Sequence, residues 1–335
     1  MTQLSHHALA LLPVLLFVGV VIWMDAFSLT KGRRLVFSVI SGSMCFVLTL
    51  LIGLLAERFA FSHYFTGTVT AIIAELLKGL PLLYLVQKRK IVLMGDATIY
   101  GTAVGAGYAI AENIHIVMSQ AFTPATAVIL GFEAAVMHIG CSSLLAYGLI
   151  IAKQETSDRS MLVRNLSVVA VFAITITIHI IHNIAPINPL LLTSILVVYF
   201  VISKRHIFKK NEASIHSWID QCLNNDVALL ASIKKGELAE TNAGKYLLSI
   251  KDAFEPEVFF DICCYISEYL ELSITAKSNL LLKEAGFPTQ RSKQTQERIT
   301  ELKALKKSIG RNGAQALKPI VDIEDVDRWA MESLL

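Results

Sequence analysis

The chain has 335 residues, of which 54% are hydrophobic and 17% charged, with a formal net charge of +3 and a mean hydropathy of +0.57. Soluble globular domains carry about 25% charged residues and are less apolar. The composition therefore excludes an ordinary soluble enzyme and predicts an all-α polytopic membrane protein.

Seven apolar runs before Lys204 are candidates for membrane-spanning helices. A bilayer core about 30 Å thick needs roughly 20 apolar residues at a rise of about 1.5 Å each. The runs cover residues 8–24, 35–56, 64–86, 98–118, 125–152, 166–185 and 190–203. The first run lacks a basic segment before it and a small-residue cleavage site, so we expect a retained anchor. We predict a transmembrane helix bundle of about seven spans over residues 1–204.

The loops between these runs alternate in their content of basic residues. Short loops rich in lysine and arginine stay on the cytoplasmic side of a membrane. One set of loops holds Lys31, Arg33, Arg34, Lys88, Arg89, Lys90, Lys153, Arg159, Arg164, Lys204, Arg205, Lys209 and Lys210. The opposite set holds only Arg58. An odd number of spans preserves this alternation, so we expect the N-terminus outside and the C-terminal region in the cytoplasm.

The region from residue 205 to residue 335 has a different character. Two thirds of all charged residues lie from Lys204 onward, with acids and bases in equal number. Apolar residues recur there at helical spacing, as in Val258, Phe259, Ile262, Ile266, Tyr269 and Leu270. We predict a small, soluble helical domain, and its balanced charge argues against nucleic-acid binding. The five cysteines show no CxxC spacing, so neither a disulfide framework nor a zinc ribbon is expected.

The predicted spans contain polar residues that are costly in a bilayer. A charge at the centre of a span costs about 2.5 to 3.5 kcal/mol on insertion scales, so such residues usually face the protein interior and suggest function. They are Glu75, Lys78, Glu112, Asn113, Glu133, His138, His179, His182 and Asn183.

The spacing of two glutamates places each on a defined helix face. Glu75 and Lys78 are three residues apart, which puts carboxylate and ammonium side by side, either as a structural ion pair or as part of a site. Glu112 shares a stripe with Gly101 and Gly105, and small residues on such a stripe let helices approach closely. We therefore expect Glu112 to point into the bundle, where it is either a buried hydrogen-bonding acid or a functional group.

Histidines occur on two consecutive spans. Thr175, His179 and Asn183 recur at intervals of four residues and so share one helix face, and His138 comes from the preceding span. A single intramembrane histidine is most often a helix-packing residue, but two of them together with two glutamates favour a site. Glu133 lies about 140° around its helix from His138, and we expect it at the membrane interface, apart from that site.

Five segments in order resemble the PrsW-type intramembrane proteases, which are related to the CAAX prenyl endopeptidases. The family pattern has EExxK in one span, a glycine-rich FxxxEN in the next, a histidine in the third and HxxxN/D in the fourth. The matching segments are AELLK at 74–78, DATIYG at 96–101, GAGYAIAEN at 105–113, His138 and HIIHN at 179–183. Two positions depart from the pattern: Ala74 stands at the first glutamate, and Tyr108 stands at the phenylalanine.

The resemblance implies hydrolysis of peptide bonds in membrane-anchored protein substrates, in the lipid bilayer of a bacterial inner membrane. The catalytic residues that it implies are Glu75, Lys78, Glu112, His138, His179 and Asn183. In this interpretation Glu75 is the base supported by Lys78, Glu112 is a second acid or base, the histidines polarise, and Asn183 donates to an oxyanion.

The cofactor and two other functions stay open. Zinc could be held by His138, His179 and Glu112 with one position left for water, but a metal-free, glutamate-dependent mechanism uses the same residues. Ala74 favours a catalytically impaired relative that only binds a membrane partner. A proton-coupled transporter would also place glutamate and histidine inside a bundle.

Overall fold

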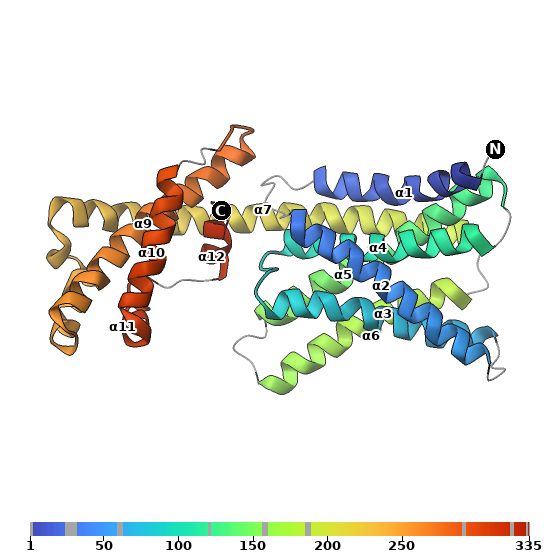
Figure 1. Ribbon diagram of the computed structural model, residues 1–335, viewed down its shortest axis with the longest axis horizontal. Coiled ribbons are helices and arrows are strands. Elements are labelled where there is room, and N and C mark those ends of the chain that lie inside the picture. The colour runs from blue at the N-terminus through green and yellow to red at the C-terminus, as the bar shows by residue number, and fades with distance from the viewer. Residues whose placement is uncertain are drawn as a thin grey trace. The chain divides into compact units, whose positions relative to one another are not determined.

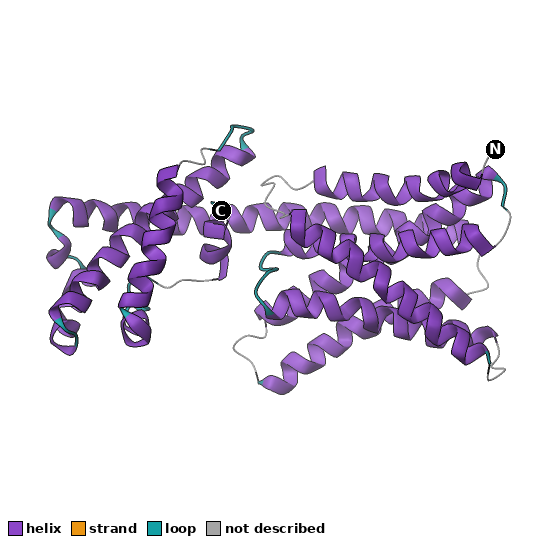
Figure 2. Ribbon diagram, in the orientation of Figure 1, coloured by secondary structure: helices purple, strands orange, loops and turns teal. Residues whose placement is uncertain are grey.

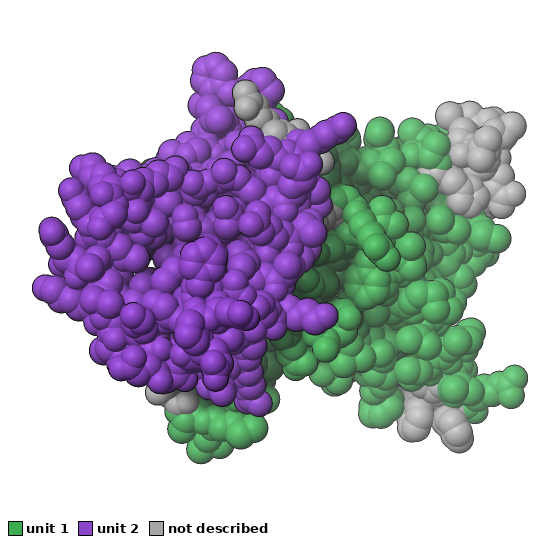
Figure 3. All heavy atoms as spheres, turned by 60° about the vertical axis from the view of Figure 1, so that its left-hand side comes forward, with its two compact units in different colours: residues 1–25, 30–211 green, residues 26–29, 212–335 purple. Residues whose placement is uncertain are grey.

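The computed structural model describes residues 3–23, 32–58, 63–119, 122–155, 160–184, 189–289, 293–321, 325–332 and 334. Throughout these ranges the regular structure is helical and contains no strand, as predicted (Figure 2). The described residues up to Asn211 form one compact unit, here called the membrane unit, and those from Glu212 onward form the C-terminal unit (Figure 3).

Seven helices correspond to the seven apolar runs (Figure 1). They are α1 (Gln3–Trp23), α2 (Gly32–Glu57), α3 (His63–Gln87), α4 (Met94–Ser119), α5 (Pro124–Glu155), α6 (Met161–Ile184) and α7 (Pro189–Lys235). Among the described residues, α2, α3, α5, α6 and α7 are long and apolar enough to cross a membrane, and α1 contains a shorter apolar segment. The count of seven spans thus stays a prediction, because neither α1 nor α4 meets that criterion.

Helix α4 can be less apolar because other helices surround it. It packs against α1, α2 and α5, and almost all of its first half is buried. Glycines bring the backbones of α2 and α4 together: a Cβ atom on Gly42 would lie 1.9 Å from the carbonyl oxygen of Val104, and one on Gly107 would lie 1.9 Å from that of Val39. At such crossings, small residues let the helix backbones pack closely, so large apolar side chains are not needed there.

Helix α7 is one continuous helix of 47 residues, so the boundary predicted at residue 204 falls inside it. Two polar contacts tie its first part to α4. The ammonium of buried Lys204 donates to Thr102 Oγ1 at 2.9 Å, and the backbone N–H of Gly95 donates to Asn211 Oδ1 at 3.0 Å. These contacts fix the first half of α4 in the membrane unit.

The C-terminal unit is a helical assembly with its own apolar core, as its periodicity predicted. After the end of α7 it contains α8 (Asn242–Ile250), α9 (Pro256–Glu284), α10 (Lys293–Ser308), α11 (Gly310–Ala316) and α12 (Asp325–Glu332), with 3₁₀ turns at Leu238–Glu240 and Lys251–Ala253. The predicted positions Ile262, Ile266, Tyr269 and Leu270 are buried in this core, and Val258 and Phe259 pack against it.

A buried charge cluster joins three helices of the C-terminal unit. The Lys277 ammonium on α9 lies 2.6 Å from Asp226 Oδ2 on α7 and 3.4 Å from Asp327 Oδ1 on α12. It also donates to Ser273 Oγ at 2.9 Å and lies 5.0 Å from the ring centroid of Trp218. Only 2% of the Lys277 side chain is exposed, so this cation is held entirely by protein groups.

We expect Lys277→Met to destabilise the C-terminal unit by about 3 to 5 kcal/mol, because two largely buried carboxylates lose their cation. Lys234 provides the matched control, since it pairs with Glu271 at 2.8 Å but is 62% exposed. Lys234→Met should cost at most about 1 kcal/mol. Denaturant unfolding of the full chain in detergent, followed by tryptophan fluorescence, measures both, and equal losses would contradict the assigned role of the buried cluster.

Candidate active site

The predicted pair on α3 forms a buried ion pair. Lys78 Nζ donates to Glu75 Oε1 at 2.6 Å, and both side chains are fully buried. His179 on α6 approaches the same carboxylate, with Nδ1 at 2.8 Å from Oε1. An ionised carboxylate can only accept, so this contact assigns the Nδ1 proton to His179. Glu75 therefore holds both an ammonium and an imidazole in place.

His138 on α5 connects this pair to Glu112 on α4. Its Nδ1 lies 3.3 Å from Lys78 Nζ, and its Nε2 lies 2.7 Å from Glu112 Oε2. Since an ammonium only donates, Nδ1 accepts from it, and the proton on Nε2 is donated to Glu112. A continuous chain of hydrogen bonds thus runs from His179 through Glu75, Lys78 and His138 to Glu112.

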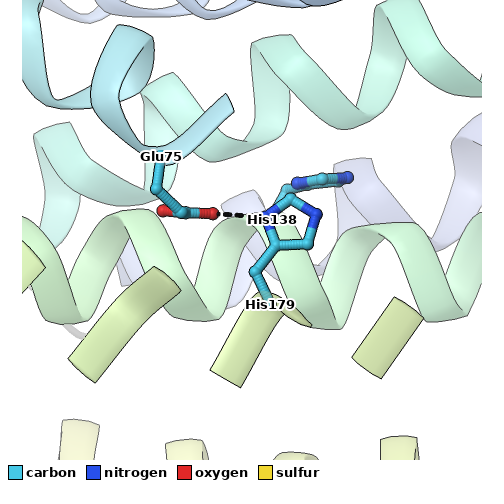
Figure 4. Close-up of side chains that lie close together, drawn as sticks. All are labelled: Glu75, His138 and His179. Atoms are coloured by element: carbon cyan, nitrogen blue, oxygen red, sulfur yellow. Dashed lines mark hydrogen bonds and ion pairs between the residues drawn. The ribbon is translucent and has the colours of Figure 1, made fainter. Parts of the chain in front are cut away.

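The two imidazoles lie edge to face, beside the ring of Tyr108. Figure 4 shows Glu75, His138 and His179 converging from α3, α5 and α6. The histidine ring centroids are 5.2 Å apart at an interplanar angle of 76°. The Tyr108 ring lies 4.3 Å from that of His138 and 5.0 Å from Lys78 Nζ, so it covers both. The tyrosine at the family's phenylalanine position thus still supplies an aromatic face.

The glycine stripe predicted on α4 brings α4 against α5 at His138. A Cβ atom on Gly105 would lie 2.3 Å from the carbonyl oxygen of His138, and one on Gly101 would lie 2.5 Å from that of Ser142. Neither contact leaves room for a side chain. The close crossing explains how His138 reaches Glu112, which lies two turns after Gly105 on α4.

We expect Gly105→Ala to destabilise the membrane unit by about 1 to 3 kcal/mol, the usual cost of overpacking, because a methyl group would press on the α5 backbone. Gly19→Ala on α1 is the matched control, since a Cβ atom there would meet nothing within 4 Å. Alanine is also the better helix former there, so that variant should be as stable as the parent or more so. Thermal unfolding in detergent compares them, and equal behaviour would contradict the close crossing.

A cavity of about 410 Å³ opens beside this centre between α2, α3, α4, α5 and α6. Its polar lining comprises Thr49, Thr66, Thr70, Tyr108, Glu112, Glu133, His138, His179, His182 and Asn183. Glu75 and Lys78 do not line it and lie behind the histidines. Glu112, by contrast, has a side chain that is 26% exposed. The carboxylate in direct reach of the cavity is therefore Glu112, and the role of base that was expected for Glu75 stays a prediction.

The expectation that Glu133 lies apart from the site is wrong. Glu133 lines the same cavity as His138. It shares a helix face with Leu130, Ala134 and Met137, which line the cavity as well. The spacing of these residues along one helix face could have predicted that Glu133 lines the cavity. The angle between Glu133 and His138 did not predict this, because a wide cavity is lined by residues from a broad sector of one helix.

The remaining sequence candidates have distinct positions. Asn183 lines the cavity, and its Nδ2 donates to the carbonyl oxygen of Gly67 on α3 at 3.4 Å. Asn113 is buried and donates to the carbonyl oxygen of Ala10 on α1 at 3.2 Å, so it joins two helices and does not face the cavity. Ala74 is fully buried in an apolar cluster with Tyr108. Nothing at that position replaces the family's first glutamate.

Three side chains have the composition of a metal site. Three potential ligand atoms lie within 4.8 Å of one another, one from each of Glu75, His138 and His179. The predicted ligand set contained Glu112 where this group has Glu75. Two histidines and one glutamate are a known donor set of catalytic zinc, and Glu75 Oε2 is a buried oxygen without a partner among the described residues. These donors fit a divalent ion in type and spacing.

Comparison with known proteins gives one match. A family model described as PrsW family intramembrane metalloprotease matches residues 26–204, which is more than half of the chain and contains α2 to α6. No curated protein and no solved structure matches the chain. The matched segment includes every residue of the hydrogen-bonded chain from His179 to Glu112.

Proposed function

The chain belongs to the PrsW family of intramembrane metalloproteases, and we propose that it hydrolyses peptide bonds of membrane-anchored protein substrates in the cavity beside Glu112. The observation that carries the proposal is the 2.7 Å contact between Glu112 and His138 at the wall of that cavity. A carboxylate that is partly exposed and held by an imidazole can take a proton from water. A peptide-bond hydrolase needs such a group where substrate and water meet.

The cavity residues divide the chemistry among them. Glu112 accepts the proton of the attacking water and returns it to the leaving amine, while His138 holds the carboxylate by donating Nε2–H. Asn183 and His179 lie on the α6 wall, where the amide of Asn183 can donate to the oxygen that becomes negative in the transition state. Glu75 and Lys78 act through the histidines, as positioning residues.

A divalent ion such as zinc would be held by Glu75, His138 and His179, where it would polarise a substrate carbonyl and lower the pKa of bound water. Lys78 Nζ contacts Glu75 Oε1 and His138 Nδ1, so a bound ion and this ammonium compete for ligand atoms. The carboxylate of Glu112, which donates no ligand atom to this group, remains available as the base.

We also propose that the C-terminal unit is cytoplasmic, with the membrane unit in a bacterial inner membrane. Two contacts support the grouping of basic loops at one end of the bundle. Arg34 donates to the carbonyl oxygen of Lys90 at 3.2 Å, and Lys153 donates to that of Val86 at 3.2 Å. Basic residues from three predicted cytoplasmic loops therefore share one end, as the positive-inside rule requires.

The proposal is tested by comparing membranes that contain the natural chain or Glu112→Gln. Quantitative proteomics of membrane and soluble fractions should find truncated single-pass proteins only with the natural chain. Identical fragment patterns would contradict the protease function and favour a relative that binds a membrane partner without cleaving it. The absence of a glutamate at Ala74 is the feature that gives this second function weight.

A further inference from the structure

The active-site cavity has an unbalanced set of fixed charges. Its described lining includes two carboxylates, Glu112 and Glu133, but no lysine or arginine. Lys78 is the nearby fixed cation, yet it is fully buried behind the lining and lies 2.6 Å from Glu75. The positive charge at the centre is thus already matched by Glu75, and the cavity itself presents negative charge.

Glu133 differs from Glu112 in having no hydrogen bond or ion pair with a described residue. It is half-buried on α5 and contributes to the cavity wall. A partly buried carboxylate without a partner is costly. A ligand that brings a cation to Glu133 therefore gains more binding free energy than a ligand that brings the same cation to an exposed carboxylate. Glu112 is already held by His138, whereas Glu133 is a cavity carboxylate that no described residue holds.

His182 supplies an independent sign that the cavity takes a polar ligand. It lines the same cavity from α6, and its Nε2 atom is buried with no partner among the described residues. An unsatisfied buried nitrogen destabilises the protein, and a hydrogen bond from a ligand would remove that cost. Glu133 and His182 thus offer two unused polar groups in one cavity, on the two helices that carry His138 and His179.

We propose that Glu133 and His182 form a substrate subsite that receives a lysine or arginine side chain close to the cleaved bond. This inference rests on the proposed protease function. An ammonium or guanidinium donates to the Glu133 carboxylate, and a guanidinium has further N–H groups that can reach His182 Nε2. In the proposed topology the His182 end of α6 faces outward, where basic residues of spanning proteins are scarce. The subsite would therefore restrict cleavage to few membrane proteins.

A binding experiment tests the subsite separately from catalysis. The probes are three fluorescent heptapeptide amides that differ only in a central lysine, norleucine or glutamate. Their binding to the full chain in phosphatidylcholine nanodiscs is followed by fluorescence anisotropy, with empty nanodiscs as the baseline. The lysine peptide should bind about 10- to 100-fold more tightly than the glutamate peptide, the size of a hydrogen bond to a charged group.

Variants at Glu133 test whether this residue causes the preference for the lysine peptide. Glu133→Gln should abolish it, Glu133→Lys should invert it, and Glu133→Asp, which keeps the charge, should retain most of it. Equal binding of the three peptides by the natural chain would overturn the proposal, as would a lysine preference that survives in folded Glu133→Gln. The proteomic comparison with Glu112→Gln reports cleavage separately, so a chain that binds lysine peptides selectively but truncates no single-pass membrane protein would refute the protease function and leave the subsite standing.

Discussion

Glu112→Gln is expected to lower the rate of substrate cleavage by about 10² to 10⁴, the range typical of a lost general acid or base. This corresponds to about 3 to 5 kcal/mol of activation free energy. Glutamine keeps the size of the side chain and can still accept from His138, but it cannot take a proton from water. The protein should stay folded, because the side chain is partly exposed and its hydrogen bond at 2.7 Å can be kept.

Two further measurements make this prediction specific. Thermal unfolding of Glu112→Gln should match that of the natural chain, which separates a lost base from a lost fold. Glu112→Asp keeps the carboxylate but withdraws it from His138, so its rate should lie between the two. Full cleavage activity in Glu112→Gln would remove Glu112 from the mechanism and return the role of base to Glu75.

Glu75→Gln is expected to act mainly through stability. Lys78 is fully buried and lies 2.6 Å from Glu75, so removing the carboxylate leaves an ammonium in the bundle without its counter-charge. Breaking such a pair costs about 3 to 5 kcal/mol. Lys78→Met should cost a similar amount for the opposite reason, because it leaves a buried carboxylate.

The double variant Glu75→Gln with Lys78→Met separates structure from chemistry. It should recover most of the lost stability, since an apolar replacement of a buried ion pair is often neutral. It should not recover cleavage, because His179 loses the carboxylate that holds its Nδ1 proton and His138 loses a donor. Additive losses in the double variant, measured by thermal unfolding, would contradict a coupled buried pair.

Local spacing was sufficient to predict several features. The three-residue interval between Glu75 and Lys78 determines a shared helix face, and the structure has the ion pair there. The glycine stripe predicted a close helix crossing, which occurs where α4 meets α5. The core of the C-terminal unit followed from the spacing of Ile262 and Ile266 for the same reason: helical periodicity depends only on neighbouring residues.

Features that depend on how helices pack were not predictable. Spacing cannot tell which of two glutamates reaches the cavity, and Glu75 lies behind the histidines while Glu112 lies in front. Glu133 was misplaced because an angle on one helix says nothing about the width of the space it faces. Helix α4 is enclosed by neighbouring helices, and this enclosure permits its polar composition. The hydropathy of α4 itself does not indicate that other helices surround it.

The most direct test of the central claim is incorporation of heavy oxygen from water into a cleaved substrate. A single-pass membrane protein that is truncated in the presence of the natural chain is reconstituted with it in lipid vesicles, in water enriched in oxygen-18. Mass spectrometry then examines the new C-terminal carboxylate. The account predicts one labelled oxygen atom per cleaved chain with the natural protein and almost no labelled product with folded Glu112→Gln. Labelled product at equal rates with both proteins, or no cleavage with either, would contradict a hydrolytic site at Glu112.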